Sequence, residues 1–184
     1  MHLRRQCFAE CPSERGRVLN VLLPMMSAVA ACELLQPDVT GLRAIDGLWS
    51  RSSSKEDIKP VKELRLAKVY EAAQHVKGTK QSSLLYEAAI IERTLGNNDN
   101  AAATITAALV ANPNNFQMRL VHIDLALASG DTTTAKKEID WCLLRRPDSQ
   151  KLQGRIQRLK QLRIEQANMP PALNKSVGTP GERK

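Results

Sequence analysis

The sequence predicts an all-α protein made of helical hairpins that follow one another along the chain. Its 184 residues include only two Trp, two Tyr and two Phe, so a core has to be built from Leu, Ile, Val and Ala. Small apolar side chains let helices approach closely, whereas β-sandwiches are usually richer in aromatic residues. Apolar residues also recur at helical spacing in several segments. The third observation is an internal repeat between residues 82 and 149, which is typical of stacked helical pairs.

The repeat has a period of 34 residues. Its matched pairs are Gly96 and Gly130, Ala101 and Ala135, Ile105 and Ile139, Ala108 and Cys142, and Pro113 and Pro147. Each residue type suits one place in a hairpin. Glycine ends the first helix because it adopts positive φ without strain. The small residues let the two helices touch, and proline ends the second helix because it cannot continue a helix interior. The register therefore predicts two hairpins of equal length.

This register resembles the tetratricopeptide repeat, with one unit over residues 82–115 and a second over residues 116–149. The resemblance lies in the joint spacing of the matched residues. The first helix of each unit departs from the family pattern. The usual aromatic is replaced by Leu85 and Arg119, and the usual Leu-Gly pair by Ala88-Ala89 and His122-Ile123. The resemblance implies an α-solenoid, in which each hairpin packs on the next.

Helical segments flank the two predicted repeats. Pro60 suits the first turn of a helix over residues 60–77, where its missing N–H costs nothing. Four apolar residues at helical spacing mark another helix over residues 150–165: Leu152, Ile156, Leu159 and Leu162. We expect this last helix to cap the end of the stack. The tail, residues 166–184, is rich in Pro and Gly and is expected to be disordered.

The N-terminal residues 1–31 have the pattern of a signal peptide. An apolar run over residues 18–31 follows basic residues and is too short to span a membrane. The run ends in Val29-Ala30-Ala31-Cys32, which resembles the lipobox of bacterial lipoproteins. That resemblance implies that Cys32 carries a lipid, which would attach the chain to a membrane.

Two other interpretations of this segment stay open. Ala28-Val29-Ala30 also fits an ordinary cleavage site, which would release a soluble periplasmic protein. The apolar run could instead be a short buried helix of a cytosolic protein. Glu10 and Glu14 depart from the leader pattern, because signal peptides are normally free of acidic residues.

Residues 32–59 are expected to form a flexible linker, with room for a short helix over residues 42–49. The stretch at residues 50–55 is rich in Ser and charge, and such a composition does not bury enough apolar area to offset chain entropy. In the lipoprotein interpretation, the linker carries the folded domain away from the lipid surface. Glu33 after the cysteine then favours the outer membrane, with the domain facing the periplasm.

The net charge of +8 does not by itself indicate nucleic-acid binding. Basic residues are interleaved with acidic ones, as over residues 62–65, and no stacking aromatics lie among them. We therefore expect no nucleic-acid partner. The cysteines and histidines match no zinc-ligand spacing, and no Gly-rich phosphate loop occurs. With Cys142 at a buried repeat position, we expect no metal, no cofactor, no catalytic residue and no enzymatic activity.

The resemblance to tetratricopeptide repeats also implies a concave surface, lined by the first helix of each hairpin, that receives a peptide or a partner helix. By register, the inward-facing positions are Tyr86, Ile90 and Arg93 in the first unit and Leu120, Asp124 and Leu127 in the second. Some family members hold a terminal carboxylate with Lys and Asn at these positions, and neither residue type occurs there. A free C-terminal peptide is therefore not the expected ligand.

Together these patterns predict a scaffold for protein–protein interaction. Because similar repeats and lipoboxes occur together in pilus and secretion lipoproteins, we expect a lipid-anchored protein that assists assembly of such an envelope machine. Two alternatives remain, namely a soluble periplasmic or cytosolic co-chaperone and a regulator of peptidoglycan enzymes. The patterns do not specify an oligomeric state.

Overall fold

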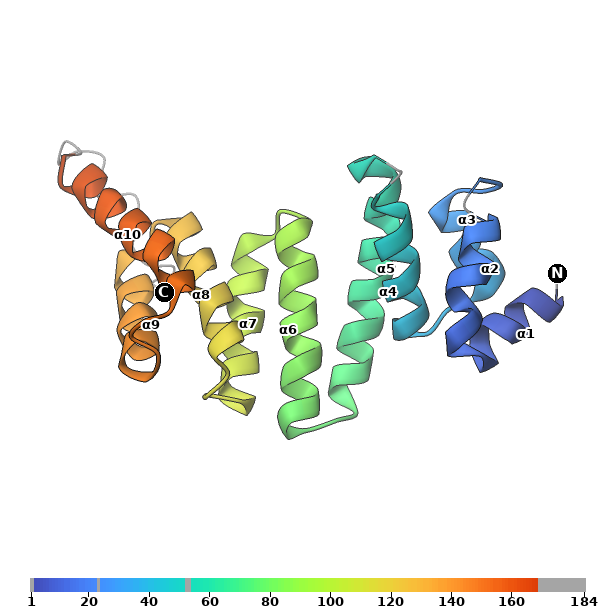
Figure 1. Cartoon of the computed structure of the whole chain (residues 1–184), viewed down its shortest axis with the longest axis horizontal. Helices are drawn as coiled ribbons and strands as arrows, with labels where there is room; N and C mark the ends of the chain where they lie inside the picture. Colours follow the sequence, from blue (N-terminus) through green and yellow to red (C-terminus); the bar gives the residue numbers. More distant parts are fainter. Residues whose placement is uncertain (1, 23, 52–53, 169–184) are drawn as a thin grey trace, which may run out of the picture. The chain divides into compact units, whose positions relative to one another are not determined.

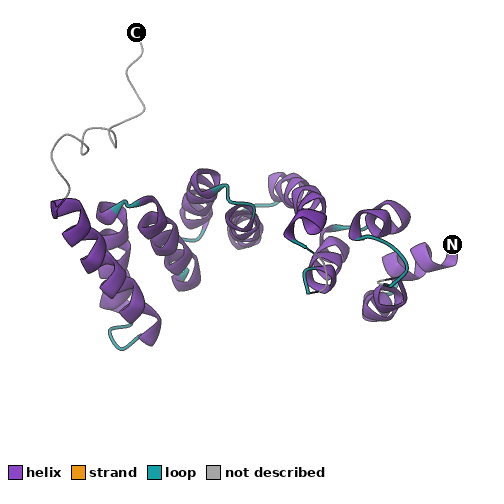
Figure 2. Cartoon of the chain, turned by 90° about the horizontal axis from the view of Figure 1, so that it is seen from above, coloured by secondary structure: helices purple, strands orange, loops and turns teal. Residues whose placement is uncertain are grey.

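The computed structural model describes residues 2–22, 24–51 and 54–168, and this part of the chain is all-α, as the sequence predicts. Figure 1 shows the helices in chain order, and Figure 2 shows the loops that join them. The helices are α1 (His2–Glu10), α2 (Arg15–Leu22), α3 (Ala28–Leu35), α4 (Val39–Trp49), α5 (Lys55–Gln74), α6 (Gly78–Thr94), α7 (Asn98–Ala111), α8 (Phe116–Ser129), α9 (Thr132–Arg145) and α10 (Gln150–Asn168), with a 3-10 turn, η1 (Pro12–Glu14). No strand occurs in the three described ranges.

The chain divides into two compact units, and each is described by itself. The N-terminal unit, Met1–Pro113, contains α1 to α7, and the C-terminal unit, Asn114–Lys184, contains α8 to α10. Within a unit, consecutive helices pack against each other as antiparallel pairs. Hairpins α6–α7 and α8–α9 belong to different units.

The segments expected as a signal peptide and a flexible linker are helical in the structure. Their apolar residues form one buried cluster: Phe8, Leu19, Leu22, Ala28, Ala31, Cys32, Leu35, Leu42, Ile45, Trp49, Ile58 and Val61. These residues recur at three- and four-residue spacing, so each short helix presents an apolar stripe. Caps fix the helix starts, since Ser27 accepts a hydrogen bond from the Ala30 N–H at 3.2 Å and Asp38 accepts one from the Gly41 N–H at 2.7 Å.

The structure therefore differs from the expectation for residues 32–59. The short helix anticipated over residues 42–49 is part of α4, and α5 begins at Lys55, ahead of the predicted start at Pro60. Ser54 caps α5 by accepting a hydrogen bond from the Asp57 N–H at 3.2 Å, and Pro60 lies inside the helix. The Ser-rich stretch ends in a helix cap, so its composition alone did not decide whether the flanking residues fold.

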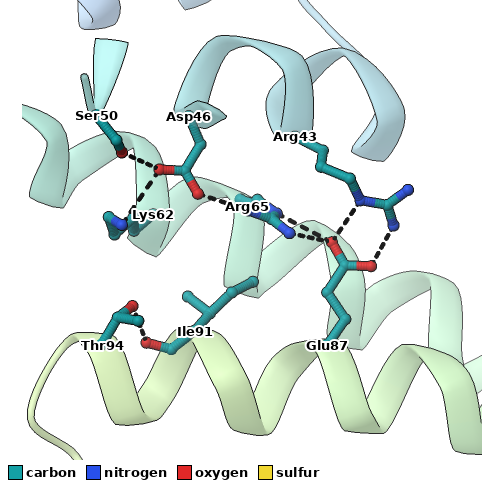
Figure 3. A network of polar contacts seen from close by, with 8 residues as sticks. All are labelled: Arg43, Asp46, Ser50, Lys62, Arg65, Glu87, Ile91 and Thr94. Carbon is teal, nitrogen blue, oxygen red and sulfur yellow. Dashed lines mark hydrogen bonds and ion pairs between the residues drawn. The ribbon is translucent and has the colours of Figure 1, made fainter. Parts of the chain in front are cut away.

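A network of charged residues ties α4 to α5 and α6 in the N-terminal unit (Figure 3). Asp46 of α4 is paired with Lys62 at 3.3 Å and with Arg65 at 2.5 Å, both from α5. Arg65 also pairs with Glu87 of α6 at 2.6 Å, and Arg43 of α4 reaches the same carboxylate. Burial alone would raise the pKa of Glu87, but the hydrogen bonds from Arg43 and Arg65 outweigh it and lower that pKa. Because cations pair with both carboxylates of this network, its role is to hold the three helices together.

Hairpin α6–α7 completes the N-terminal unit. Gly96, after α6, has φ of 84°, the positive value expected for a residue that ends a helix. Ala101, Ile105 and Ala108 on α7 are fully buried, so the two helices meet where the matched residues are small. The hydroxyl of Tyr70 on α5 lies 2.7 Å from the Thr104 hydroxyl on α7.

The C-terminal unit consists of hairpin α8–α9 and helix α10. Gly130 ends α8 with φ of 76°, and Ala135 and Cys142 on α9 are fully buried. The core contains residues of all three helices: Leu120, Ile123, Ala126, Leu127, Ala135, Ile139, Cys142, Leu152, Leu159 and Leu162. Helix α10 therefore packs against both helices of the hairpin.

Helix α10 is longer than predicted and ends at Asn168, three residues beyond the expected boundary at 165. The side-chain amide of Gln166 donates a hydrogen bond to the Gly130 carbonyl at 2.8 Å, which ties the last turn of α10 to the α8–α9 turn. This contact explains why residues 166–168 do not belong to the predicted disordered tail. The rest of that tail, residues 169–184, lies outside the described residues.

Candidate functional site

An open groove of about 430 Å³ lies between α8 and α10 in the C-terminal unit. Six residues line it: Asp124, Leu127 and Ala128 from α8, and Gly154, Arg155 and Arg158 from α10. We call it the α8/α10 groove. Its walls combine apolar surface with two guanidinium groups, which is a composition suited to a peptide with both apolar and acidic side chains.

Arg155 and Asp124 join the two walls of the groove. The Arg155 Nε donates to Asp124 Oδ1 and the Arg155 Nη2 donates to Asp124 Oδ2, each at 2.7 Å. The paired geometry is the strong arrangement for a guanidinium and a carboxylate. The side chains remain 24% and 33% exposed, so the pair lies at the groove surface and not in the core. It sets the local position of α10 against α8.

Gly154 leaves part of the α10 backbone uncovered in the groove. No heavy atom outside the local helix lies within 4 Å of the position that a Cβ would occupy, so packing does not require glycine here. Glycine inside a helix costs about 1 kcal/mol relative to alanine. Without a Cβ at this position, the helix backbone is open toward the groove.

Arg158 supplies the exposed charge on the α10 wall. Its Nη1 pairs with Glu165, seven residues further along α10, at 3.4 Å. Both side chains are about half exposed. An exposed pair of this kind contributes little to stability and exchanges readily with other partners. The Arg158 guanidinium is therefore accessible to a carboxylate on a bound peptide.

The structure brings together only part of the predicted partner-binding set. Asp124 and Leu127 lie on the α8/α10 groove. Leu120 is 2% exposed and belongs to the core of the C-terminal unit, so its side chain offers no surface to a partner. Leu127 is also largely buried, and only an edge of it faces the groove. Leucines at these positions pack against α10, whose apolar stripe covers them.

Tyr86, Ile90 and Arg93 lie on α6 in the N-terminal unit. Their spacing puts them on one side of the helix, where Tyr86 and Ile90 are half-buried and Arg93 is exposed. They form a second candidate surface, separate from the groove of the C-terminal unit.

Sequence reasoning missed the α10 wall of the groove. The signal was present, because one period of 34 residues after Leu120 and Asp124 gives Gly154 and Arg158. The apolar spacing of residues 150–165 predicts only a capping helix, and the matched repeat pairs end before them. Arg155 could not be found in this way, since its role depends on how α10 crosses α8.

The buried cysteines do not have the properties of nucleophiles. Cys32 is 7% exposed, and burial, with a smaller contribution from Glu33, raises the pKa of its thiol to about 11. Cys142 is fully buried, and burial, followed by the charge of Glu138, raises its pKa. A thiol that stays protonated and covered is an inert packing group.

Glu138 of α9 forms a polar cluster with Arg119 and His122 of α8. Glu138 is 6% exposed, is paired with Arg119 and lies 3.5 Å from Nδ1 of His122. Burial raises its pKa, but the interactions with His122 and Arg119 outweigh that effect and lower the pKa. The cluster joins α8 to α9 in the same way as the network in the N-terminal unit joins its helices.

The described residues contain no group of three His, Cys, Asp or Glu side chains that could hold a metal ion. None of the helices in the described ranges is both long enough and apolar enough to cross a membrane. The chain matches no protein-family model and has no significant similarity to a curated protein or to a solved structure.

Proposed function

We propose that this chain is a non-catalytic scaffold that binds other proteins, and that the α8/α10 groove receives a peptide segment of a partner. The observation that carries the proposal is the groove itself, with apolar surface from Leu127 and Ala128 beside an exposed guanidinium and a bare stretch of helix backbone at Gly154. Grooves between helices are a common way of binding an extended or helical peptide.

The local geometry of the two hairpins supports the further proposal that they are units of a tetratricopeptide-like repeat. The Asn97 N–H donates to the Glu92 carbonyl at 2.9 Å, and one period later the Asp131 N–H donates to the Ala126 carbonyl at 2.8 Å. Helices α7 and α9 each have 14 residues. Their C-caps also agree, because Asn112 and the residue one period later both have φ of −145°.

In this proposal, α10 acts as the first helix of a further, incomplete unit. Gly154 and Arg158 then take the positions that Leu120 and Asp124 hold in α8. Successive first helices line the concave face of such repeats, so a groove between α8 and α10 is the surface on which a partner is expected.

In vivo photo-crosslinking tests the proposal. We would place a photoreactive benzoylphenylalanine at Ala128 or Arg158 in the full chain, with the exposed Lys59 of α5 as the control position. The proposal predicts one discrete protein adduct from both groove positions and none from Lys59. An absence of adducts at the groove, or the same adducts at all three positions, would contradict it.

Lipid attachment at Cys32, and with it assistance to a pilus or secretion machine in the bacterial envelope, is a separate proposal that rests on the sequence pattern. Because the thiol is buried in the folded N-terminal unit, acyl transfer would have to occur before α1 to α3 fold. The mass of the N-terminal peptide from membrane fractions tests it. A lipidated Cys32 that is lost in Cys32→Ala supports it, and an intact N-terminus favours the soluble co-chaperone alternative.

A further inference from the structure

Two arginines at the C-terminal end of α9 lie on aromatic rings, away from the residues that line the α8/α10 groove. Arg145 is the last residue of α9, and its Cζ is 3.7 Å from the ring centroid of Trp141. Arg146 follows as the C-cap, with its Cζ 4.6 Å from the ring centroid of Phe116. Both arginines are exposed, and both rings are half-buried.

Stacking holds each guanidinium by its face and leaves its N–H edge open to a ligand. Arg119 provides an internal comparison, because it also lies over Trp141, at 3.8 Å, but is paired with Glu138. In the part of the chain that the structure describes, no ion pair involves Arg145 or Arg146. These two cations are therefore ordered by the aromatic rings and not neutralised.

Leu144 adds an apolar contact beside the arginine pair. It immediately precedes Arg145 on α9, and its side chain is 83% exposed. A single exposed leucine is ordinary on a protein surface. Here, however, it adds apolar contact area beside arginines and aromatic rings, which are residue types enriched at protein interfaces.

A purely structural role explains only part of this arrangement. Positive charge at the last turn of a helix is favourable because it faces the negative end of the helix dipole. That effect needs neither two stacked aromatic rings nor an exposed leucine. The remaining features are those of a surface prepared for an anionic partner with apolar character.

We propose that Leu144, Arg145 and Arg146 bind an acidic peptide segment of a partner protein. Each guanidinium takes one carboxylate of the peptide, and Leu144 packs on an apolar side chain next to the acidic residues. A nucleic acid would satisfy the cations but would leave Leu144 without a partner, so charge and apolar area together favour a peptide. This surface shares no residue with the α8/α10 groove, so its failure would leave the groove proposal intact.

The test is a titration of the full chain, labelled with ¹⁵N, with synthetic peptides of Glu-Glu-Leu repeats. The indole N–H signal of Trp141, assigned by its loss in Trp141→Phe, reports on the site directly. We expect this signal to shift with the Glu-Glu-Leu peptide and not with a Gln-Gln-Leu peptide of the same length. The double variant R145Q/R146Q should lose about tenfold in affinity. The control K59Q/K160Q, with the same change in net charge, should stay within about twofold because Lys59 lies on α5 and Lys160 on α10, and neither is part of the proposed surface.

A second comparison tests the apolar contact. The variant Leu144→Ser should weaken binding of the Glu-Glu-Leu peptide and leave binding of a Glu-Glu-Ser peptide unchanged. The difference between the two effects measures the interaction between Leu144 and the leucine of the peptide. The proposal would be overturned by no movement of the Trp141 signal, by an equal loss in K59Q/K160Q, or by an oligouridylate that binds as tightly as the acidic peptide. A Leu144→Ser effect that is the same for both peptides would remove the leucine from the site and also overturn it.

Discussion

The guanidinium of Arg155 donates two hydrogen bonds of 2.7 Å to the carboxylate of Asp124, and this pair joins α10 to α8 at the candidate groove. The two residues lie 31 positions apart in the sequence. This contact has two roles in the proposed function. It holds the two walls of the groove together, and it pairs Arg155, so that Arg158 is the groove arginine left for a carboxylate of the partner.

Replacing Asp124 by Asn should lower the free energy of unfolding by about 1 kcal/mol, because the pair is bidentate but partly exposed. Arg155→Lys should cost nearly as much, since a lysine cannot make both hydrogen bonds. Urea unfolding of the full chain measures both. The exposed Lys136–Asp140 pair supplies the matched control, and Lys136→Gln should cost less than about 0.5 kcal/mol. Equal losses in all three variants would show that the bidentate geometry of the Arg155–Asp124 pair adds no stability over an ordinary exposed ion pair.

Gly154→Ala should raise the free energy of unfolding by about 0.5 to 1 kcal/mol, because the added methyl group meets no neighbour and alanine favours the helix. Thermal unfolding followed by circular dichroism measures the change. A destabilised variant would mean that the backbone at Gly154 is packed more closely than the structure shows.

Gly130→Ala should have the opposite sign and cost about 1 kcal/mol, although space is also available there. The nearest atom to an added Cβ at Gly130 is the Gln166 side-chain nitrogen, at an ordinary 3.7 Å, but φ is 76°. A residue with a Cβ is strained at that φ. Gly96→Ala should show the same loss for the same reason, since its φ is 84° and no atom lies within 4 Å. If either substitution proved neutral in urea unfolding, the turn at that position would not have the positive φ.

Removing residues 1–31 should expose the apolar faces of Leu35, Leu42, Ile45 and Trp49 and abolish cooperative unfolding of the N-terminal unit. Hydrogen exchange of α4 and α5 in the full chain and in the fragment measures the loss. A fragment that protects α4 as well as the full chain does would show that the N-terminal helices are dispensable, as a cleaved leader would be.

Acid should destabilise both units through carboxylates whose pKa values are depressed by cations. Arg43 and Arg65 lower the pKa of Glu87, and His122 and Arg119 lower that of Glu138. A depressed folded-state pKa gives stability that is present above the ordinary carboxyl value of 4.5 and is lost as pH falls through the folded-state value. Glu138→Gln should therefore be less stable than wild type at neutral pH. The difference should shrink below pH 4.5 in urea titrations, and a pH-independent difference would contradict this account.

The sequence predicted the hairpins well because their determinants are local. Glycines that end helices, small residues where helices touch and prolines that follow helices act within one period, so Gly96, Gly130, Ala101 and Ala135 could be placed from spacing alone. The helices before residue 55 could not be assigned in the same way. An apolar run such as residues 18–31 has the same composition whether it is a leader or a buried helix, so composition alone does not predict that it packs with Leu42, Ile45 and Trp49.

The candidate groove was only half predictable. Asp124 and Leu127 follow from the repeat register. The register, however, predicts only which side of a helix a residue lies on, and not which other helix covers that side. Leu120 is core because α10 covers it, and Arg155 reaches Asp124 because of the angle at which α10 crosses α8. Such tertiary relationships are set by packing between helices and have no signature in the spacing of one helix.

The most direct test of the central claim is the affinity of the crosslinked partner segment for three forms of the full chain: wild type, Gly154→Ala and Gly154→Leu. The leucine side chain would fill the α8/α10 groove without disturbing the core, since the space beside Gly154 is open. The account predicts an affinity about tenfold weaker for Gly154→Leu and within about twofold of wild type for Gly154→Ala. Binding by Gly154→Leu as tight as that of wild type would contradict the claim that the partner lies in this groove.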